Sequence, residues 1–241
     1  MKMCFFSLPA TVFVVYAFLS PIPMQALLLD FDTDYTAGTY LDGQPTAGTQ
    51  WSGGGNDFML VEKSGVDHSI ALVTANRNNG SAETLFAPDS TDLPDFDAAS
   101  SVLEISFQYR FEEAPVWDTG KENVSTVAVV QCGYNGNEKE AAAVFLIRSN
   151  GEILFYNADK SILISAFTAE DNTTWFTVSA RLDYAQQTYT FSINGTPYVT
   201  GGGTSAFKFR GNTDSANFRI RNQGSPHHKK IIFDNITMTL Q

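Results

Sequence analysis

The sequence predicts an all-β protein built as an antiparallel β-sandwich. Three observations lead to this prediction. Apolar and polar residues alternate with a period of two along most of the chain, turns rich in glycine and asparagine separate the alternating runs, and helical periodicity is nearly absent. The 19 phenylalanines, 9 tyrosines and 18 glycines add to the same tendency. Short, regularly spaced strands with turns between them are typical of two packed antiparallel sheets.

The first 26 residues are expected to be a secretory signal peptide. Lys2 supplies a short basic region, an apolar run extends from Cys4 to Leu19, and two prolines then interrupt it. Ala26 completes a cleavage site, so we expect the protein to be secreted and its mature chain to begin at Leu27. The apolar run is shorter than the ~20 residues that a spanning helix requires, so no membrane span is expected.

The mature chain, Leu27 to Gln241, is expected to form one sandwich domain because neither an internal repeat nor a proline-rich linker divides it. Cleavage removes Cys4 and leaves Cys132 without a second cysteine, so we expect no intrachain disulfide. The full chain has 15 Lys and Arg against 26 Asp and Glu, a net charge of −11. Because a phosphate backbone requires a basic footprint, nucleic acid is not expected as a partner.

The first clear strand runs from Val102 to Phe111. Its odd residues are large and apolar and its even residues are polar, which predicts a half-buried strand with the even side chains outward. Thr126 to Cys132 predicts a more apolar strand. Ala143–Arg148 and Glu152–Asn157 flank a Ser-Asn-Gly turn, which is typical of a hairpin.

The same pattern continues to the end of the chain. Trp175 to Leu182 alternates, a turn follows over Asp183–Gln187, and Tyr189 to Ile193 alternates again. Lys230 to Leu240 is expected to be the closing strand. Any helix is expected to be short and peripheral, over Asn137 to Ala143.

Several of these segments resemble a known superfamily. Trp175–Asp183 followed by Tyr189–Gly195 resembles the paired strands of laminin-G-like and concanavalin A-like jelly rolls, in which a W-x-x-V strand leads to a Y-x-x-x-x-N-G strand. Phe233–Ile236 looks like the closing strand of secreted bacterial sandwich modules. The opening segment, from Leu29 to Trp51, is similar to the start of jelly-roll proteins from polysaccharide-degrading bacteria. The resemblance implies a jelly roll, a fold that hosts lectins, carbohydrate-binding modules, hydrolases and lyases.

The resemblance also indicates which catalytic motifs an enzyme of this fold would contain. Family 16 glycoside hydrolases have E-x-D-x-(x)-E on one strand face, whereas jelly-roll alginate lyases have R-x-E-L-R, Q-[IV]-H and a tyrosine-rich final strand. The mature sequence contains neither set, and the residue types nearest to the lyase set are Gln131 and Tyr109. We therefore expect a non-catalytic protein. A polysaccharide lyase or glycoside hydrolase with an unfamiliar site is the alternative.

Calcium is the metal that the sequence favours. In several carbohydrate-binding sandwiches a structural calcium links an acidic residue of the first strand to the aspartate of the closing strand, and the resemblance places Asp32 and Asp234 at these positions. Carboxylate oxygens are suitable ligands for this hard cation. The alternative is that Asp234 caps a turn or accepts hydrogen bonds from backbone amides.

The outward polar side chains predict the ligand site. Gln108, Arg110 and Arg181 fall on outward positions of their strands, and Trp117 lies in a polar segment expected to be a loop. Guanidinium groups can hold carboxylate or sulfate in a bidentate manner, and aromatic rings can stack on sugars. Other residues of suitable type are Trp51, Tyr134, Tyr156, Trp175, Arg148, Arg219 and Arg221.

We therefore predict a secreted, monomeric, non-catalytic protein that binds a polysaccharide or other glycan. Two alternatives remain open besides the enzyme. The polar faces would also suit an ordinary solvated sheet surface, and the resemblance would also suit a laminin-G-like adhesive or structural module with a protein partner.

Overall fold

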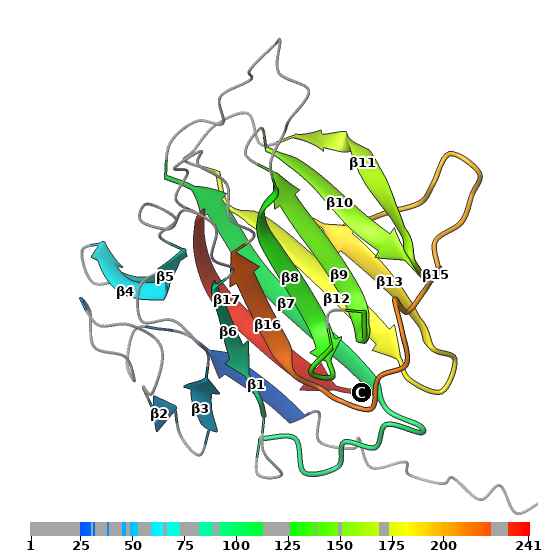
Figure 1. Cartoon of the computed structure of the whole chain (residues 1–241), viewed down its shortest axis with the longest axis horizontal. Helices are drawn as coiled ribbons and strands as arrows, with labels where there is room; N and C mark the ends of the chain where they lie inside the picture. Colours follow the sequence, from blue (N-terminus) through cyan, green and yellow to red (C-terminus); the bar gives the residue numbers. More distant parts are fainter. Residues whose placement is uncertain are drawn as a thin grey trace, which may run out of the picture.

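The computed structural model describes residues 25–29, 31, 38, 45–46, 49–52, 59–64, 67–72, 82–88, 92–112, 126–137, 139–148, 151–168, 174–222 and 231–241. These residues form strands, turns and loops, and among them there is no helix long and apolar enough to cross a membrane. The strands form two antiparallel sheets that pack face to face, as Figure 1 shows, so the predicted all-β sandwich is confirmed. The described residues near Asn137 form a turn and not the short helix considered there: Glu140 N–H donates to Asn137 O at 2.9 Å, and a strand begins at Ala141.

One sheet has nine strands in the described residues. Its main path runs β14-β13-β12-β7-β17-β5-β4, with β1 pairing to β17 and β15 pairing to β13. The strands are β1 (Gln25–Leu29), β4 (Met59–Ser64), β5 (Asp67–Leu72), β7 (Val102–Phe111), β12 (Phe176–Asp183), β13 (Thr188–Ile193), β14 (Thr196–Pro197), β15 (Phe207–Lys208) and β17 (Ile231–Leu240).

The second sheet has eight strands in the described residues, in the order β11-β10-β9-β8-β16-β6-β3-β2. Figure 1 shows its long strands stacked across those of the first sheet. The strands are β2 (Pro45–Thr46), β3 (Thr49–Ser52), β6 (Ala82–Phe86), β8 (Thr126–Tyr134), β9 (Ala141–Arg148), β10 (Glu152–Asn157), β11 (Lys160–Thr168) and β16 (Phe218–Asn222).

The core fills the space between the two sheets. Along β7 the odd residues are buried and the even residues are half-buried, so the strict alternation of the sequence places every other side chain in the core. Phe107 of β7 lies 6.1 Å from Phe145 of β9 and 5.8 Å from Phe218 of β16, measured between ring centroids. Aromatic side chains of the two sheets therefore interdigitate, as expected for an aligned sandwich.

The two ends of the described chain meet in the nine-stranded sheet. β1 pairs with β17 from Gln25↔Leu240 to Leu29↔Ile236. β17 also pairs with β7, and the register shifts between Asp234 and Thr237. Asn235 has a φ of 47°, so a local irregularity turns this part of the closing strand.

Candidate functional site

Three of the predicted site residues lie together on the outer face of the nine-stranded sheet. Gln108 of β7 is opposite Asp234 of β17, and its Oε1 accepts a hydrogen bond from Asn235 Nδ2 at 3.0 Å. Two residues along β7, the guanidinium of Arg110 lies over the ring of Trp175, 5.1 Å from its centroid. An amide, a carboxylate and a cation on an aromatic ring are thus neighbours on this face.

Arg181, the fourth described residue of the predicted site, lies elsewhere on the same sheet. It is opposite Glu104 in the pairing of β12 with β7, whereas Gln108 is opposite Thr177. Four residues of strand separate the two positions, roughly 14 Å. Arg181 Nε donates to Gln241 Oε1 at 3.3 Å, so its nearest partner is the chain end. Trp117 lies outside the described residues.

Asp234, the predicted calcium ligand on the closing strand, is only 5% exposed. Its Oδ1 accepts a hydrogen bond from the backbone N–H of Asn235 at 2.8 Å. A hydrogen bond from a backbone amide is the contact expected if Asp234 has a structural role and does not bind calcium. Asp32 lies outside the described residues, and the described part of the chain contains no group of three or more His, Cys, Asp or Glu residues that could hold a metal.

A second polar surface lies on the outer face of the eight-stranded sheet. Phe218 and Ile220 of β16 point into the core, so Arg219 and Arg221 between them point outward. Two further arginines join this surface, Arg148 at the end of β9 and Arg210 in the segment before β16. We call the outer surface defined by Arg148, Arg210, Arg219 and Arg221 the arginine face.

Arg219 is the most enclosed of the four arginines. Its side chain is 3% exposed, its Nη1 donates to Gln131 Oε1 at 2.7 Å, and its guanidinium lies 4.3 Å from the ring centroid of Tyr134. Both partners come from β8, the strand that pairs with β16. The amide fixes the rotation of the guanidinium and the ring fixes its plane, so the cation is held in one orientation.

Gly133 explains how Tyr134 reaches this face. Cys132 is in the core, so regular alternation would place Tyr134 in the core as well. Gly133 between them has a φ of +65°, a conformation that glycine adopts without strain. The turned backbone places the Tyr134 ring under Arg219.

Arg210 repeats the arrangement at the other side of the face. Its guanidinium lies 4.0 Å from the ring centroid of Tyr156 on β10, and its backbone N–H donates to Ala141 O at 3.1 Å. Between the two Arg–Tyr pairs is an apolar floor that packs as a small cluster separate from the main core. The cluster contains Val129, Ala141, Val144, Leu146 and Tyr156.

At least one arginine of this face has a carboxylate partner. Arg148 Nη1 forms an ion pair with Glu152 Oε2 at 2.8 Å, and Arg221 is opposite Glu83 in the pairing of β16 with β6. Burial, and to a smaller extent the neighbouring Arg221, lowers the pKa of Arg219 to about 10. Arg219 therefore remains a cation at neutral pH, in a position where water solvates it poorly.

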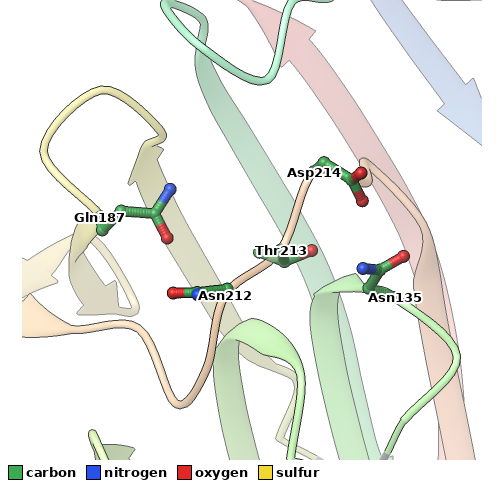
Figure 2. A pocket seen from close by; sticks show the side chains of 5 residues that line it. All are labelled: Asn135, Gln187, Asn212, Thr213 and Asp214. Carbon is green, nitrogen blue, oxygen red and sulfur yellow. The ribbon is translucent and has the colours of Figure 1, made fainter.

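An open polar pocket of about 240 Å³ lies beyond the end of β8. Figure 2 shows the amides of Gln187 and Asn212 on one side and the Asp214 carboxylate and Asn135 amide on the other. Thr213 between them donates its hydroxyl to Gly133 O at 2.7 Å. These groups could bind hydroxyls, but the lining residues include neither an aromatic ring nor a cation, so the pocket is a weaker candidate than the arginine face.

Sequence reasoning identified part of the arginine face and missed the rest. The sequence indicated two tyrosines and three of the arginines as residue types that could bind a glycan, namely Tyr134, Tyr156, Arg148, Arg219 and Arg221. Nothing in the sequence showed that they share one surface. Arg210 was missed because its segment, between β15 and β16, does not alternate. Gln131, which the comparison with lyase motifs singled out, proves to be the hydrogen-bond acceptor of Arg219.

Comparisons with known proteins relate this chain to others through its fold. No protein-family model and no curated protein matches the sequence. Among solved structures, a sialidase aligns with a TM-score of 0.55 and 10% identity over 85% of this chain and 19% of its own. The carbohydrate esterase vb_24B_21 from Shiga toxin-encoding bacteriophage phi24B aligns with a TM-score of 0.53 and 16% sequence identity. The alignment covers 79% of this chain and 90% of the esterase. The alginate lyase Aly36B aligns with a TM-score of 0.53 and 12% sequence identity. The alignment covers 90% of this chain and 96% of the lyase.

These likenesses show that the chain shares a β-sandwich fold with the three proteins. The chain spans about a fifth of the length of the sialidase, whereas it covers nearly the whole of the esterase and the lyase. At such low identity the likeness shows the fold and leaves activity to be argued from the site.

Proposed function

We propose that the protein is a secreted, non-catalytic, polysaccharide-binding sandwich of the concanavalin A-like jelly-roll type, and that it binds the polysaccharide on the arginine face. The proposal has support from the fold, because the similar structures include a sialidase, a carbohydrate esterase and an alginate lyase. It has support from the sequence, because the hydrolase and lyase motifs of such folds are absent from the mature chain.

The observation that carries the proposal is the pair of arginines stacked on tyrosines at the two sides of an apolar floor. Arg210, which is half-buried, lies on Tyr156 and presents hydrogen-bond donors at a fixed position, whereas the enclosed Arg219 on Tyr134 forms the other border of the floor. A polysaccharide chain has hydroxyl and other polar groups at its rim and apolar ring faces between them. The arrangement therefore offers donors and an apolar surface where a sugar chain requires each.

The outer face of the nine-stranded sheet is the competing location, because it contains Gln108, Arg110 and Arg181. Much of its polar surface is already internally hydrogen-bonded: Ser106 and Ser179 share a hydrogen bond at 2.9 Å, and Gln241 Nε2 donates to Glu104 Oε2 at 2.9 Å. Small hydroxyl side chains that bond to each other offer less to a ligand than stacked guanidinium groups. We therefore place the ligand on the arginine face and keep the outer face of the nine-stranded sheet as the alternative that the variants below test.

A second candidate function, a polysaccharide lyase, is favoured by one specific contact. β-Elimination from a uronate requires a cation that neutralises the carboxylate and a base that removes the adjacent proton. Arg219 lying on Tyr134 places a cation and a phenol in contact. Release of unsaturated products from a uronate polymer, followed by absorbance, would support this function and overturn the non-catalytic proposal.

Affinity electrophoresis through gels that contain a panel of polysaccharides tests the proposed function. We expect at least one polymer to retard the protein, and Tyr156→Ala to reduce the retardation at least fivefold because it removes the ring beneath Arg210. The matched variants Arg110→Ala and Arg181→Ala alter the competing face. If these two lose retardation and Tyr156→Ala does not, the ligand lies on the nine-stranded sheet. If no polymer retards the protein, the proposed function is wrong.

A further inference from the structure

We propose that the polar pocket beyond the end of β8 is a second carbohydrate site, which binds one neutral, hexose-sized sugar unit through its hydroxyl groups. The site goes beyond the proposed function, because it requires no ligand on the arginine face. Three features of the pocket lead to it: the way the fold holds the lining residues in place, the volume they enclose, and the hydrogen-bonding groups they present.

Three segments that are far apart in the sequence form the pocket. Asn135 begins the turn between β8 and β9, Gln187 ends the turn between β12 and β13, and residues 212–214 belong to the segment that leads into β16. Figure 2 shows their side chains around the hollow. Loops at the end of a rigid sandwich are common positions for binding residues, because the sheets fix where each loop begins and ends.

Hydrogen bonds join the three segments to one another. The Thr213 hydroxyl donates to Gly133 O at 2.7 Å, which fixes the segment before β16 against the end of β8. Phe209 N–H donates to Gln187 O at 3.0 Å, which fixes the same segment against the turn between β12 and β13. The pocket is therefore formed before any ligand arrives, so a ligand need not order the loops on binding.

The volume of the pocket, about 240 Å³, suits one sugar ring. A cavity of about 150 Å³ is enough to hold benzene, so the additional space accommodates the hydroxyl groups around a six-membered ring. A bare metal ion requires far less space, since calcium takes its oxygen ligands at only about 2.3–2.6 Å. A ligand the size of a monosaccharide therefore fits the hollow better than an ion does.

The lining groups match the hydrogen-bonding character of sugar hydroxyls. The amides of Asn135, Gln187 and Asn212 each contain a donor and an acceptor, and the carboxylate of Asp214 is an acceptor. A hydroxyl both donates and accepts, so it can bond to each of these groups. Asp214 is expected to be the main anchor, because hydrogen bonds to a charged group are about twice as strong as neutral ones.

These groups are accessible to a ligand. The side chains of Asn135, Asn212 and Asp214 are exposed, so a sugar can replace the water around their polar atoms. Gln187 is half-buried, and its Nε2 donates to Tyr184 O at 2.8 Å, which fixes the amide and leaves its Oε1 to accept from a ligand. Its φ of 52° is one that glycine adopts without strain, so the fold keeps an amide side chain here at a conformational cost.

The same lining disfavours charged sugars and limits the affinity. The five lining residues include no cation, so the carboxylate of an acidic sugar would face Asp214 without a counter-charge. They include no aromatic ring either, so binding depends on hydrogen bonds that compete with water. We therefore expect a Kd on the order of 1 mM for a neutral monosaccharide and weaker binding of its acidic counterpart.

NMR signals of the side-chain amides test the site directly, because Asn135, Gln187 and Asn212 each contribute one amide group to it. D-Galactose, D-glucose and D-mannose are titrated to about 50 mM, well above the expected Kd. Each is compared with its uronate, so that the members of a pair differ in charge and not in ring. We expect one neutral sugar to shift all three signals with a common Kd, and its uronate to bind at least fivefold more weakly. Equal binding of the two overturns the preference for a neutral ligand.

Two variants of the lining locate the sugar. Asp214→Asn replaces the charged acceptor with a neutral one of the same size and is expected to weaken binding at least fivefold. Asn212→Ala removes one amide and is expected to weaken binding at least threefold. Asp159→Asn makes the same change of charge at an exposed turn between β10 and β11 and is expected to bind like the parent. Melting temperatures establish that all three variants are folded.

The remaining outcomes separate this site from the arginine face and from an ion site. Tyr156→Ala, which alters the arginine face, is expected to bind the monosaccharide like the parent. Parental binding by folded Asp214→Asn and Asn212→Ala overturns the placement in the pocket. Shifts of the three amide signals with calcium chloride, in the absence of shifts with any sugar, overturn the sugar in favour of an ion. No shift with any of these probes overturns the second site and leaves the polysaccharide on the arginine face, which affinity electrophoresis tests separately.

Discussion

Gly133 is the residue at which the core and the arginine face depend on a single backbone angle. An added Cβ would lie 2.9 Å from the Cβ of Ala142 and 2.9 Å from the Tyr184 hydroxyl, at a φ of +65°. We expect Gly133→Ala to lower the free energy of unfolding by about 3 kcal/mol, because backbone strain and overpacking add. Urea unfolding measures this loss.

Gly195 provides the matched control for Gly133. It also has a positive φ, +76°, but no atom lies within 4 Å of its added Cβ. Gly195→Ala is expected to cost about 1 kcal/mol, the strain alone. Equal losses in the two variants would show that the contacts with Ala142 and Tyr184 are not tight, and would contradict the overpacking cost assigned to Gly133→Ala.

Buried phenols and the buried thiol determine how stability responds to alkaline pH. Burial raises the pKa of Tyr109, Tyr184, Tyr189 and Cys132 above their ordinary values. Above the ordinary pKa values the unfolded chain loses these protons while the folded chain keeps them. The unfolded state then binds fewer protons, so stability is full below about pH 8 and decreases as pH rises above it.

Each such group is expected to contribute a loss of up to about 1.4 kcal/mol per pH unit above its unfolded pKa. Urea unfolding at pH 8, 9.5 and 10.5 measures the slope. Tyr184→Phe removes one titrating group and the hydrogen bond from its hydroxyl to Ser215 O at 2.5 Å, so it should be less stable at pH 8 but show a shallower slope. A slope unchanged from the parent would contradict the assignment.

At the scale of strands, alternation predicted which elements form, whereas it did not predict which of them are neighbours. The prediction of Val102–Phe111 matches β7 residue for residue, because one face of that strand is uniformly large and apolar. The predicted end of β8 at Cys132 was two residues short, since Gly133 interrupts the period. Register is not encoded in either strand alone, so the distance of Arg181 from Gln108 followed only from the pairing of β12 with β7.

The closing strand is where the calcium prediction can be separated from its alternative. If Asp32 and Asp234 hold calcium, a site at 100 times its Kd stabilises the fold by about 2.7 kcal/mol, and EDTA should lower the melting temperature by roughly 5–10 °C. Asp234→Asn keeps an oxygen that can accept the Asn235 N–H but removes the charge. We therefore expect the variant to melt below the parent in calcium and not to respond to EDTA.

The alternative predicts a different pair of melting curves. If Asp234 serves only as the acceptor for the Asn235 N–H, the asparagine variant should melt like the parent. EDTA should then change neither protein. Differential scanning calorimetry with added calcium and with EDTA distinguishes the two.

At the scale of the whole molecule, the fold could be predicted because the alternation of apolar and polar residues recurs in many strands. The arrangement of the candidate site could not be predicted in this way. The arginine face gathers residues from β8, β9, β10, β16 and the segment before β16, which only the closed sandwich brings together. The sequence indicated arginines and aromatic rings as candidate site residues. It could not show that two Arg–Tyr pairs would border one apolar floor on the outer face of the eight-stranded sheet.

The position of the expected cleavage site affects both ends of the described chain, because β1 contains the site and pairs with β17. Cleavage after Ala26 would remove Gln25 and Ala26, which pair with Leu240 and Thr239, and would keep the three pairs from Leu27 onward. Two terminal residue pairs contribute little to the stability of the fold, so their loss is compatible with cleavage after Ala26. We therefore still expect the exported protein to begin at Leu27. We also expect it to melt within about 4 °C of a chain that begins at Gln25. Edman sequencing of the exported protein and calorimetry of both chains check this. A first residue far from Leu27, or a much larger fall in melting temperature, would show that the leader ends elsewhere or that β1 requires its full length.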